Sequence, residues 1–249
     1  MAKAADPKNM IAFQGVLGAN SDMACRAVYP EMTTLPCESF EDTFAAVAER
    51  RAGLAMIPIE NSSAGRVADI HHLLPESGLH IVAEHFQKVD HQLLAPKGAS
   101  MDTVREVHSH VQALSQCRKF IRGHGLKPVV HVDTAGAAAE VAERGDPGQA
   151  AIASELAGEI YKLQSLKRDV QDTEHNTTRF IIMAKDPIDP DPAEGPVITT
   201  FVFRVRSVPA ALYKSLGGFA TNGVNISKLE SYILDGAFTV AQFYADIEG

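Results

Sequence analysis

Cysteine is scarce in this chain of 249 residues, which holds only three, at Cys25, Cys37 and Cys117. An odd number of cysteines at unrelated spacings suggests neither a disulfide framework nor a zinc site. The sequence therefore predicts a protein of a reducing compartment, the cytoplasm.

Positive charge and long apolar runs are also lacking. Lysine and arginine total 23 against 31 aspartate and glutamate residues, which gives a formal net charge of −8. Such a balance argues against nucleic acid and membrane surfaces as partners, and an acidic ligand would need a local positive site. No apolar run reaches the length of a membrane span. Residues 1–10 are polar, lack the apolar core of an export signal and are expected to be disordered.

What the chain does have is a polar segment that runs directly into an apolar one. Residues 176–179 read Asn-Thr-Thr-Arg, and residues 180–183 read Phe-Ile-Ile-Met. The short apolar run, bounded by turn-forming residues, predicts a buried strand that follows a polar loop. Polar groups at strand ends are where open α/β folds bind ligands, although Thr and Asn side chains also stabilise ordinary turns.

Strand and helix patterns alternate along the rest of the chain, which predicts mainly parallel sheets covered on both faces. Residues 11–85 and 175–185 form one predicted lobe, and residues 95–170 form a second. Two crossings join the lobes, and a cleft between lobes is a common ligand site. Residues 186–196, rich in proline and acids, predict a stiff linker. Residues 197–249 read as a strand, a helix and two strands.

The first candidate site follows a predicted buried strand over residues 54–59. Small polar residues lead from it into a helix predicted over residues 66–74. Backbone N–H groups at a helix start favour an anion such as a carboxylate. A plain turn in which Ser62 or Ser63 caps the helix fits the same pattern.

The second candidate segment, residues 108–117, reads His-Ser-His-Val-Gln-Ala-Leu-Ser-Gln-Cys. Strand alternation puts His108 and His110 on one face and Ser109 on the other. Two histidines without a third ligand do not define a metal site, so no metal is expected. Cys117 falls among apolar helix positions and is interpreted as a core residue rather than a nucleophile.

The third candidate is the polar segment of residues 176–179. Arg179 offers a planar fork that suits a carboxylate, either of a ligand or of a structural ion pair. The Thr178 hydroxyl is a weak acid, so its expected catalytic use is a hydrogen bond to a departing oxygen.

Together these segments resemble the prephenate dehydratase family over residues 11–185. The matching motifs, in order, are Pro58-Ile59-Glu60-Asn61-Ser62, Ser109 with Gln112 to Cys117, Asp133 to Ala138, and Asn176-Thr177-Thr178-Arg179-Phe180. The resemblance implies an α/β catalytic domain of two lobes, periplasmic-binding-protein-like (type II), with the site in its cleft. It also implies decarboxylation and dehydration of prephenate to phenylpyruvate in phenylalanine biosynthesis, without a metal or an organic cofactor.

The resemblance also assigns roles residue by residue. It implies that Thr178 assists departure of the ring hydroxyl. The other catalytic positions fall on Glu60, Asn61, Ser109 and Gln116. The substrate-binding residues are expected to be Ser62, Ser63, Gly65, Thr177 and Arg179.

Residues 197–249 resemble the ACT regulatory domain, a ferredoxin-like α+β fold. The match covers the helix opening at residues 208–212 and the segment Leu229, Glu230 and Ser231, where phenylalanine is expected to act as an allosteric effector. The family's Glu-Ser-Arg-Pro reads Glu-Ser-Tyr-Ile at residues 230–233, and the final helix and strand are missing. We therefore expect an incomplete domain whose exposed edge favours pairing with another chain. The resemblance implies a homodimer or homotetramer.

Three alternatives remain beside a prephenate dehydratase. An arogenate dehydratase shares the fold and the chemistry. A cytosolic small-anion binding module shares the fold but has no need of the polar segment at residues 176–179. A purely regulatory amino-acid sensor would depend on residues 197–249 alone.

Overall fold

The computed structural model describes residues 6–67, 70–191, 193, 195–233 and 241–248. They form two compact units, residues 1–187 and 188–249. Pro7–Asn9 make a 3-10 turn, and the first strand starts at Met10. Disorder across residues 1–10 is therefore a wrong prediction for residues 6–10, while residues 1–5 lie outside the described residues.

In the described part of the chain, no helix combines the length and the apolar character that crossing a bilayer requires.

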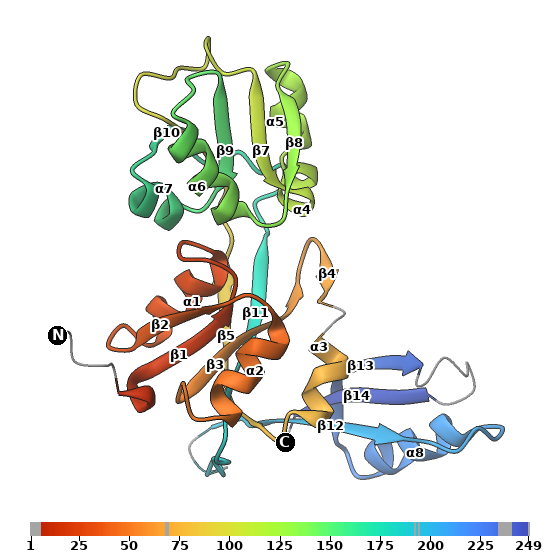
Figure 1. Ribbon diagram of the computed structural model, residues 1–249. Helices are drawn as coiled ribbons and strands as arrows, with labels where there is room; N and C mark the ends of the chain where they lie inside the picture. Colours follow the sequence, from red (N-terminus) through yellow and green to blue (C-terminus); the bar gives the residue numbers. More distant parts are fainter. Residues whose placement is uncertain (1–5, 68–69, 192, 194, 234–240, 249) are drawn as a thin grey trace. The chain divides into compact units, whose positions relative to one another are not determined.

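The first lobe of the N-terminal unit is built on a mixed sheet in the order β2-β1-β3-β11-β5, with β4 paired to β3 (Figure 1). Its strands are β1 (Met10–Gln14), β2 (Thr33–Cys37), β3 (Leu54–Asn61), β4 (Gly65–Arg66), β5 (His80–Lys88) and β11 (Thr177–Ala184). Its helices are α1 (Asn20–Val28), α2 (Phe40–Ala48) and α3 (Ile70–Leu73). Strand β1 is parallel to β2 and β3, whereas β11 is antiparallel to β3 and β5. The prediction of a mainly parallel sheet is therefore wrong for β5 and β11, the two strands that adjoin the crossings between the lobes.

The second lobe is a five-stranded sheet in the order β10-β6-β9-β7-β8. Its strands are β6 (Gln92–Ala95), β7 (Glu106–His110), β8 (Lys127–His131), β9 (Gln149–Ala153) and β10 (Gln164–Lys167). Its helices are α4 (Val111–Gln116), α5 (Arg118–Gly123), α6 (Thr134–Arg144) and α7 (Glu155–Tyr161). Sequence patterns missed β10, which has four residues and only one apolar side chain, Leu166.

Alternation along the strands of this second lobe builds two hydrophobic cores. Leu93 and Ile152 face one core together with Cys117, whereas Leu94 and Ala153 face the other. Helices thus cover both faces of the sheet, and the predicted two-lobed α/β architecture is confirmed. Cys117 is fully buried, and burial raises the pKa of its thiol to about 12, which agrees with its predicted core role.

The two crossings between the lobes are hydrogen-bonded to one another. Val89 N–H donates to the Asn176 carbonyl at 2.8 Å, and Val170 N–H donates to the His91 carbonyl at 3.0 Å. The paired crossings place residues 89–91 and 170–176 next to the start of β11.

The C-terminal unit contains β12 (Ile198–Arg204), α8 (Ala211–Thr221), β13 (Asn225–Ile233) and β14 (Ala241–Glu248). Its sheet has the order β12-β14-β13, and β14 is antiparallel to both neighbours. Two parallel strands that flank an antiparallel one form the split βαβ arrangement of ferredoxin-like folds. The rings of Phe201 and Phe219 stack at 5.6 Å and join α8 to the sheet.

Candidate active site

Residues 177–179 lie inside β11 rather than in a loop before it. The pairing of β11 with β3 puts Thr178 opposite Asn61 and Arg179 opposite Glu60, and the register shifts between Arg179 and Phe180. Directly opposed residues of an antiparallel pair share a face of the sheet, so their side chains meet. The register therefore brings together polar residues that are 117 and 119 positions apart in the chain.

The side-chain amide of Asn61 makes four hydrogen bonds. Its oxygen accepts from the backbone N–H groups of Ser63 at 2.9 Å and Ala64 at 2.8 Å. A backbone N–H can only donate, so the amide NH₂ must face the other way. It donates to Thr178 Oγ1 at 2.9 Å and to Asn176 Oδ1 at 2.8 Å. Asn61 therefore positions Thr178, and its polar atoms are already used within the protein.

The Thr178 hydroxyl is left with a proton to donate. Thr178 is 9% exposed, and its oxygen accepts the hydrogen bond from Asn61. Among the described residues, no acceptor receives the proton of this hydroxyl. The geometry thus supplies one oriented hydrogen-bond donor at the carboxyl end of β3.

The chain of amides continues into the second lobe. Asn176 Nδ2 donates to Gln116 Oε1 at 3.1 Å, and His91 Nε2 lies 2.9 Å from the same oxygen. We call Asn61, Asn176, Thr178, Gln116 and His91 the amide network. It joins β3 and β11 to the end of α4, so predicted catalytic residues from both lobes meet.

Residues 61–66 form a tight hairpin rather than the predicted start of a helix. Gly65 and Arg66 pair with Asn61 and Glu60 as β4, and the next described helix is α3, which begins at Ile70. Asn61 already occupies the N–H groups of residues 63 and 64. The expected helix start at these residues is therefore wrong, while the substrate-binding role of Gly65 stays a prediction.

The serines expected to bind substrate hold the return strand instead. Ser62 Oγ accepts from Thr177 N–H at 3.0 Å and donates to the His175 carbonyl at 3.3 Å. Ser63 Oγ donates to the same carbonyl at 3.2 Å. These hydrogen bonds hold the backbone of residues 175–177, which precede Thr178 in the chain.

Arg179 lies between two carboxylates on neighbouring strands. Its Nε and NH2 atoms lie 2.9 and 2.8 Å from Glu84 Oε2 on β5, and its NH1 lies 3.3 Å from Glu60 Oε1 on β3. Arg179 is 9% exposed, and its guanidinium lies 6.0 Å from the Phe86 ring centroid. Of the two interpretations of this residue, the geometry favours the structural ion pair, through which Arg179 orients Glu60.

Ser109 stands apart from the amide network. It is fully buried in β7, and its hydroxyl donates to the Ile152 carbonyl at 2.5 Å. In the described residues no hydrogen bond joins it to the network. Its catalytic role stays a prediction.

The histidines of β7 have separate surroundings. His108 is 2% exposed, and its Nδ1 lies 3.2 Å from Nε2 of His131. His110 instead accepts from Gln112 N–H at the start of α4. Within the described ranges, no three His, Cys, Asp or Glu side chains are grouped so that they could hold a metal ion.

Burial lowers the pKa values of His91 and His108 below the ordinary value, against the opposing effects of Gln116 and Asp90 on His91 and of two glutamates on His108. The unfolded chain therefore binds protons more readily, and stability falls as the pH drops below about 6.5. We expect the loss of unfolding free energy between pH 7.5 and 5.5 to be smaller in His91→Gln and His108→Gln. Urea denaturation at the two pH values checks this. The same loss of unfolding free energy in wild type and in both variants would contradict it.

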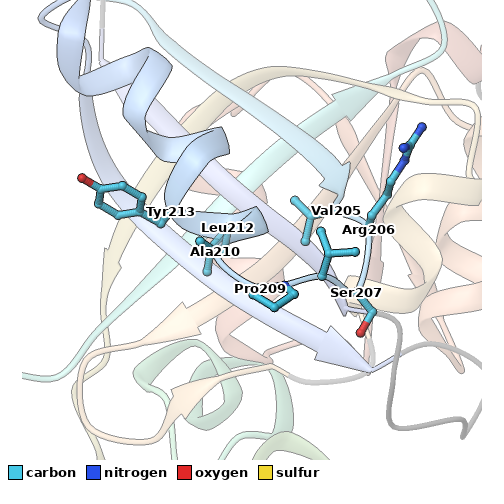
Figure 2. A pocket seen from close by; sticks show the side chains of 8 residues that line it. Val205, Arg206, Ser207, Pro209, Ala210, Leu212 and Tyr213 are labelled. Carbon is cyan, nitrogen blue, oxygen red and sulfur yellow. The ribbon is translucent and has the colours of Figure 1, made fainter.

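A pocket of about 460 Å³ lies elsewhere, in the C-terminal unit between the end of β12 and the first turn of α8 (Figure 2). Its lining consists of residues 205–210, 212 and 213. None of the predicted catalytic residues lines it, and neither do Leu229, Glu230 and Ser231, which lie on β13. This cavity is therefore no part of the candidate active site.

Sequence reasoning missed three contributors: His91, Glu84 and the side chain of Asn176. Asn176 was visible as part of the polar segment. His91 and Glu84 lie in the extended residues 80–95 and belong to no motif. No sequence signal singled out His91, whose immediate neighbours Asp90 and Gln92 are polar.

Reversing the polarity of Asn61 tests the network. Asn61→Asp keeps the shape but supplies only acceptors, so the Thr178 hydroxyl would donate to the new carboxylate rather than to a ligand. We expect the catalytic rate to fall about tenfold, which corresponds to an activation free energy raised by roughly 1.4 kcal/mol. Steady-state rates of the two proteins check this, with Asn225→Asp on β13 as a control for the charge change. Equal rates for Asn61→Asp and wild type would contradict the role of Asn61.

The family model described as prephenate dehydratase matches residues 11–188. A bifunctional N-acyl-homoserine lactone acylase/prephenate dehydratase of Komagataeibacter europaeus is 52% identical over 242 residues, which cover 97% of this chain and 86% of the relative.

An arogenate dehydratase/prephenate dehydratase 2 of Arabidopsis thaliana is 40% identical over 221 residues. The match covers 89% of this chain but only 58% of the plant protein. Among solved structures, the prephenate dehydratase of Arthrobacter aurescens in complex with L-Phe superposes with a TM-score of 0.88 at 28% identity, over 96% of this chain and 80% of that chain.

Proposed function

The chain belongs to the prephenate dehydratase family, and we propose that it converts prephenate into phenylpyruvate, with Thr178 as the donor to the departing hydroxyl. The observation that carries this role is the orientation of the Thr178 hydroxyl. Its oxygen is occupied by Asn61, so its proton is available to a ligand.

The reaction requires few functional groups from the protein. The bond from the ring to one carboxylate breaks and releases carbon dioxide, and its electron pair enters the ring. The ring hydroxyl then leaves and, with one proton consumed overall, becomes water. Formation of an aromatic ring makes the products strongly favoured. The protein mainly orients the substrate, excludes water and stabilises charge on the departing oxygen.

The remaining residues support this proposal in two ways. Gln116 turns its NH₂ group away from the two donors that hold its oxygen, so that group is available to the substrate. Glu60 is oriented by Arg179 and positions the leaving group or a neighbouring donor. Ser109 and the serines of the hairpin are proposed as supporting positions.

The experiment that tests the function is phenylpyruvate formation from prephenate, followed by absorbance, with arogenate in a parallel reaction. Turnover of prephenate supports the proposal. Faster turnover of arogenate would make the arogenate dehydratase the better description. Tight binding of both compounds without turnover would support the binding module.

The 52% identical relative carries a second activity in its name, which makes amide hydrolysis of N-acyl-homoserine lactones a second candidate. Release of homoserine lactone by the purified chain tests it. Thr178→Val serves as the comparison, because an acylase activity that survives this change uses a different set of groups.

We further propose that phenylalanine binds the C-terminal unit as an effector. Support comes from the ferredoxin-like strand order and from the relative of known structure that is bound to L-Phe. Calorimetric titration with phenylalanine tests this, and absence of heat at millimolar ligand contradicts it. A homodimer or homotetramer in the cytoplasm is proposed on the family resemblance alone.

A further inference from the structure

His91 is held in place by its backbone as well as by its side chain. Its N–H donates to Gln171 Oε1 at 2.9 Å, and its carbonyl accepts from Val170 N–H at 3.0 Å. The side chain of Gln171 in turn reaches Asp90 Oδ1 at 3.3 Å. The residue is 2% exposed. It is thus fixed to the paired crossings while its ring points to α4 of the second lobe.

The polarity of the amide network determines which atom of the His91 ring carries the proton. The N–H groups of residues 63 and 64 fix the Asn61 oxygen, so the Asn61 NH₂ group donates to Asn176 Oδ1. The Asn176 NH₂ group then faces Gln116, and Gln116 must accept through Oε1. The remaining contact to that oxygen, from His91 Nε2, can only be a donated N–H.

We propose that His91 is a positioning residue that locks the carboxamide of Gln116, with its NH₂ group directed to the substrate, by donating a hydrogen bond from Nε2. The opposite rotamer of the carboxamide would set its NH₂ group against two other N–H donors. In the described residues, the NH₂ group of Gln116 has no protein partner, which leaves both of its hydrogens for a ligand. The catalytic part of this inference rests on the proposed function, whereas the orientation of Gln116 does not.

The first test determines the orientation of the Gln116 carboxamide without measuring catalytic activity. The ¹⁵N chemical shifts of the histidine rings distinguish the two neutral tautomers, and His91→Gln identifies the signals of His91. We expect His91 to be neutral at pH 7 with its proton on Nε2. A proton on Nδ1 would overturn the proposal, because Nε2 would then be an acceptor facing the Gln116 oxygen.

The second test is a double-mutant cycle between His91 and Gln116. We expect His91→Leu to lower kcat at least about tenfold with a smaller change in KM, since one oriented donor is lost in the transition state. In a Gln116→Leu background the same change should have little further effect, because the residue it acts through is gone. His91→Gln retains an amide N–H near the position of Nε2 and should recover most of the rate.

A purely structural role predicts different numbers. His91→Leu would then lower the rate by the same factor in both backgrounds, and His91→Gln would not restore it, which would refute the positioning role. His108→Leu is the matched control for stability, because His108 is also 2% exposed but its ring contacts His131 rather than Gln116. A wild type that leaves prephenate intact refutes the proposed function and the catalytic part of this inference, while the tautomer still decides the orientation of Gln116.

Discussion

Thr178→Val is expected to fold, to bind prephenate and to turn it over about a hundredfold or more slowly than wild type, as is typical when one donor to developing charge is removed. Valine has nearly the shape of threonine but lacks the hydroxyl. The donor that faces the ligand disappears, and the Asn61 NH₂ group loses one acceptor. Phenylpyruvate formation under saturating prephenate measures the effect on kcat.

Thr43→Val provides the control for the cost of removing a buried hydroxyl. Thr43 is fully buried, and its hydroxyl donates to the Ser39 carbonyl at 2.8 Å in the first turn of α2. We expect this variant to be less stable and to retain its kcat. A Thr178→Val protein with wild-type kcat would leave the family assignment standing and would contradict the mechanism.

The sequence predicted the residues of the site better than their arrangement in space. Polar residues at the ends of apolar runs identified Asn61 and Thr178. No local pattern states that β11 returns beside β3 in the register that opposes these two residues. That register depends on two crossings and on a shift in the pairing near Pro58, whose missing N–H interrupts the ladder.

The wrong prediction of a helix that starts near residue 66 has a local cause. A hydroxyl-rich segment after a strand fits a capped helix and a hairpin equally well. Asn61 decides between them by accepting from two successive N–H groups, and Gly65 closes the hairpin with a φ of 82°. The choice depends on Thr178 and Asn176, which hold the other side of the Asn61 amide and lie far away in the chain.

Arg179→Leu is expected to lower the free energy of unfolding by about 2–3 kcal/mol, less than the loss from a fully buried pair because its partners are partly solvated. The side chains of Glu60 and Glu84 are 35% and 32% exposed, and without Arg179 they face each other across β11. Urea denaturation measures the loss. Arg51→Leu, which removes an exposed pair with Glu49, should cost no more than about 1 kcal/mol.

Adding Glu84→Leu separates the structural part of this ion pair from its part in catalysis. The double variant no longer carries an unpaired carboxylate on β5, so we expect it to regain most of the lost stability. Its kcat should stay low, because Glu60 still lacks the guanidinium that orients it. A direct contact between Arg179 and the substrate predicts instead that both variants lose activity mainly through a raised KM. Recovery of kcat in the double variant would show that the orientation of Glu60 by Arg179 is not needed for turnover.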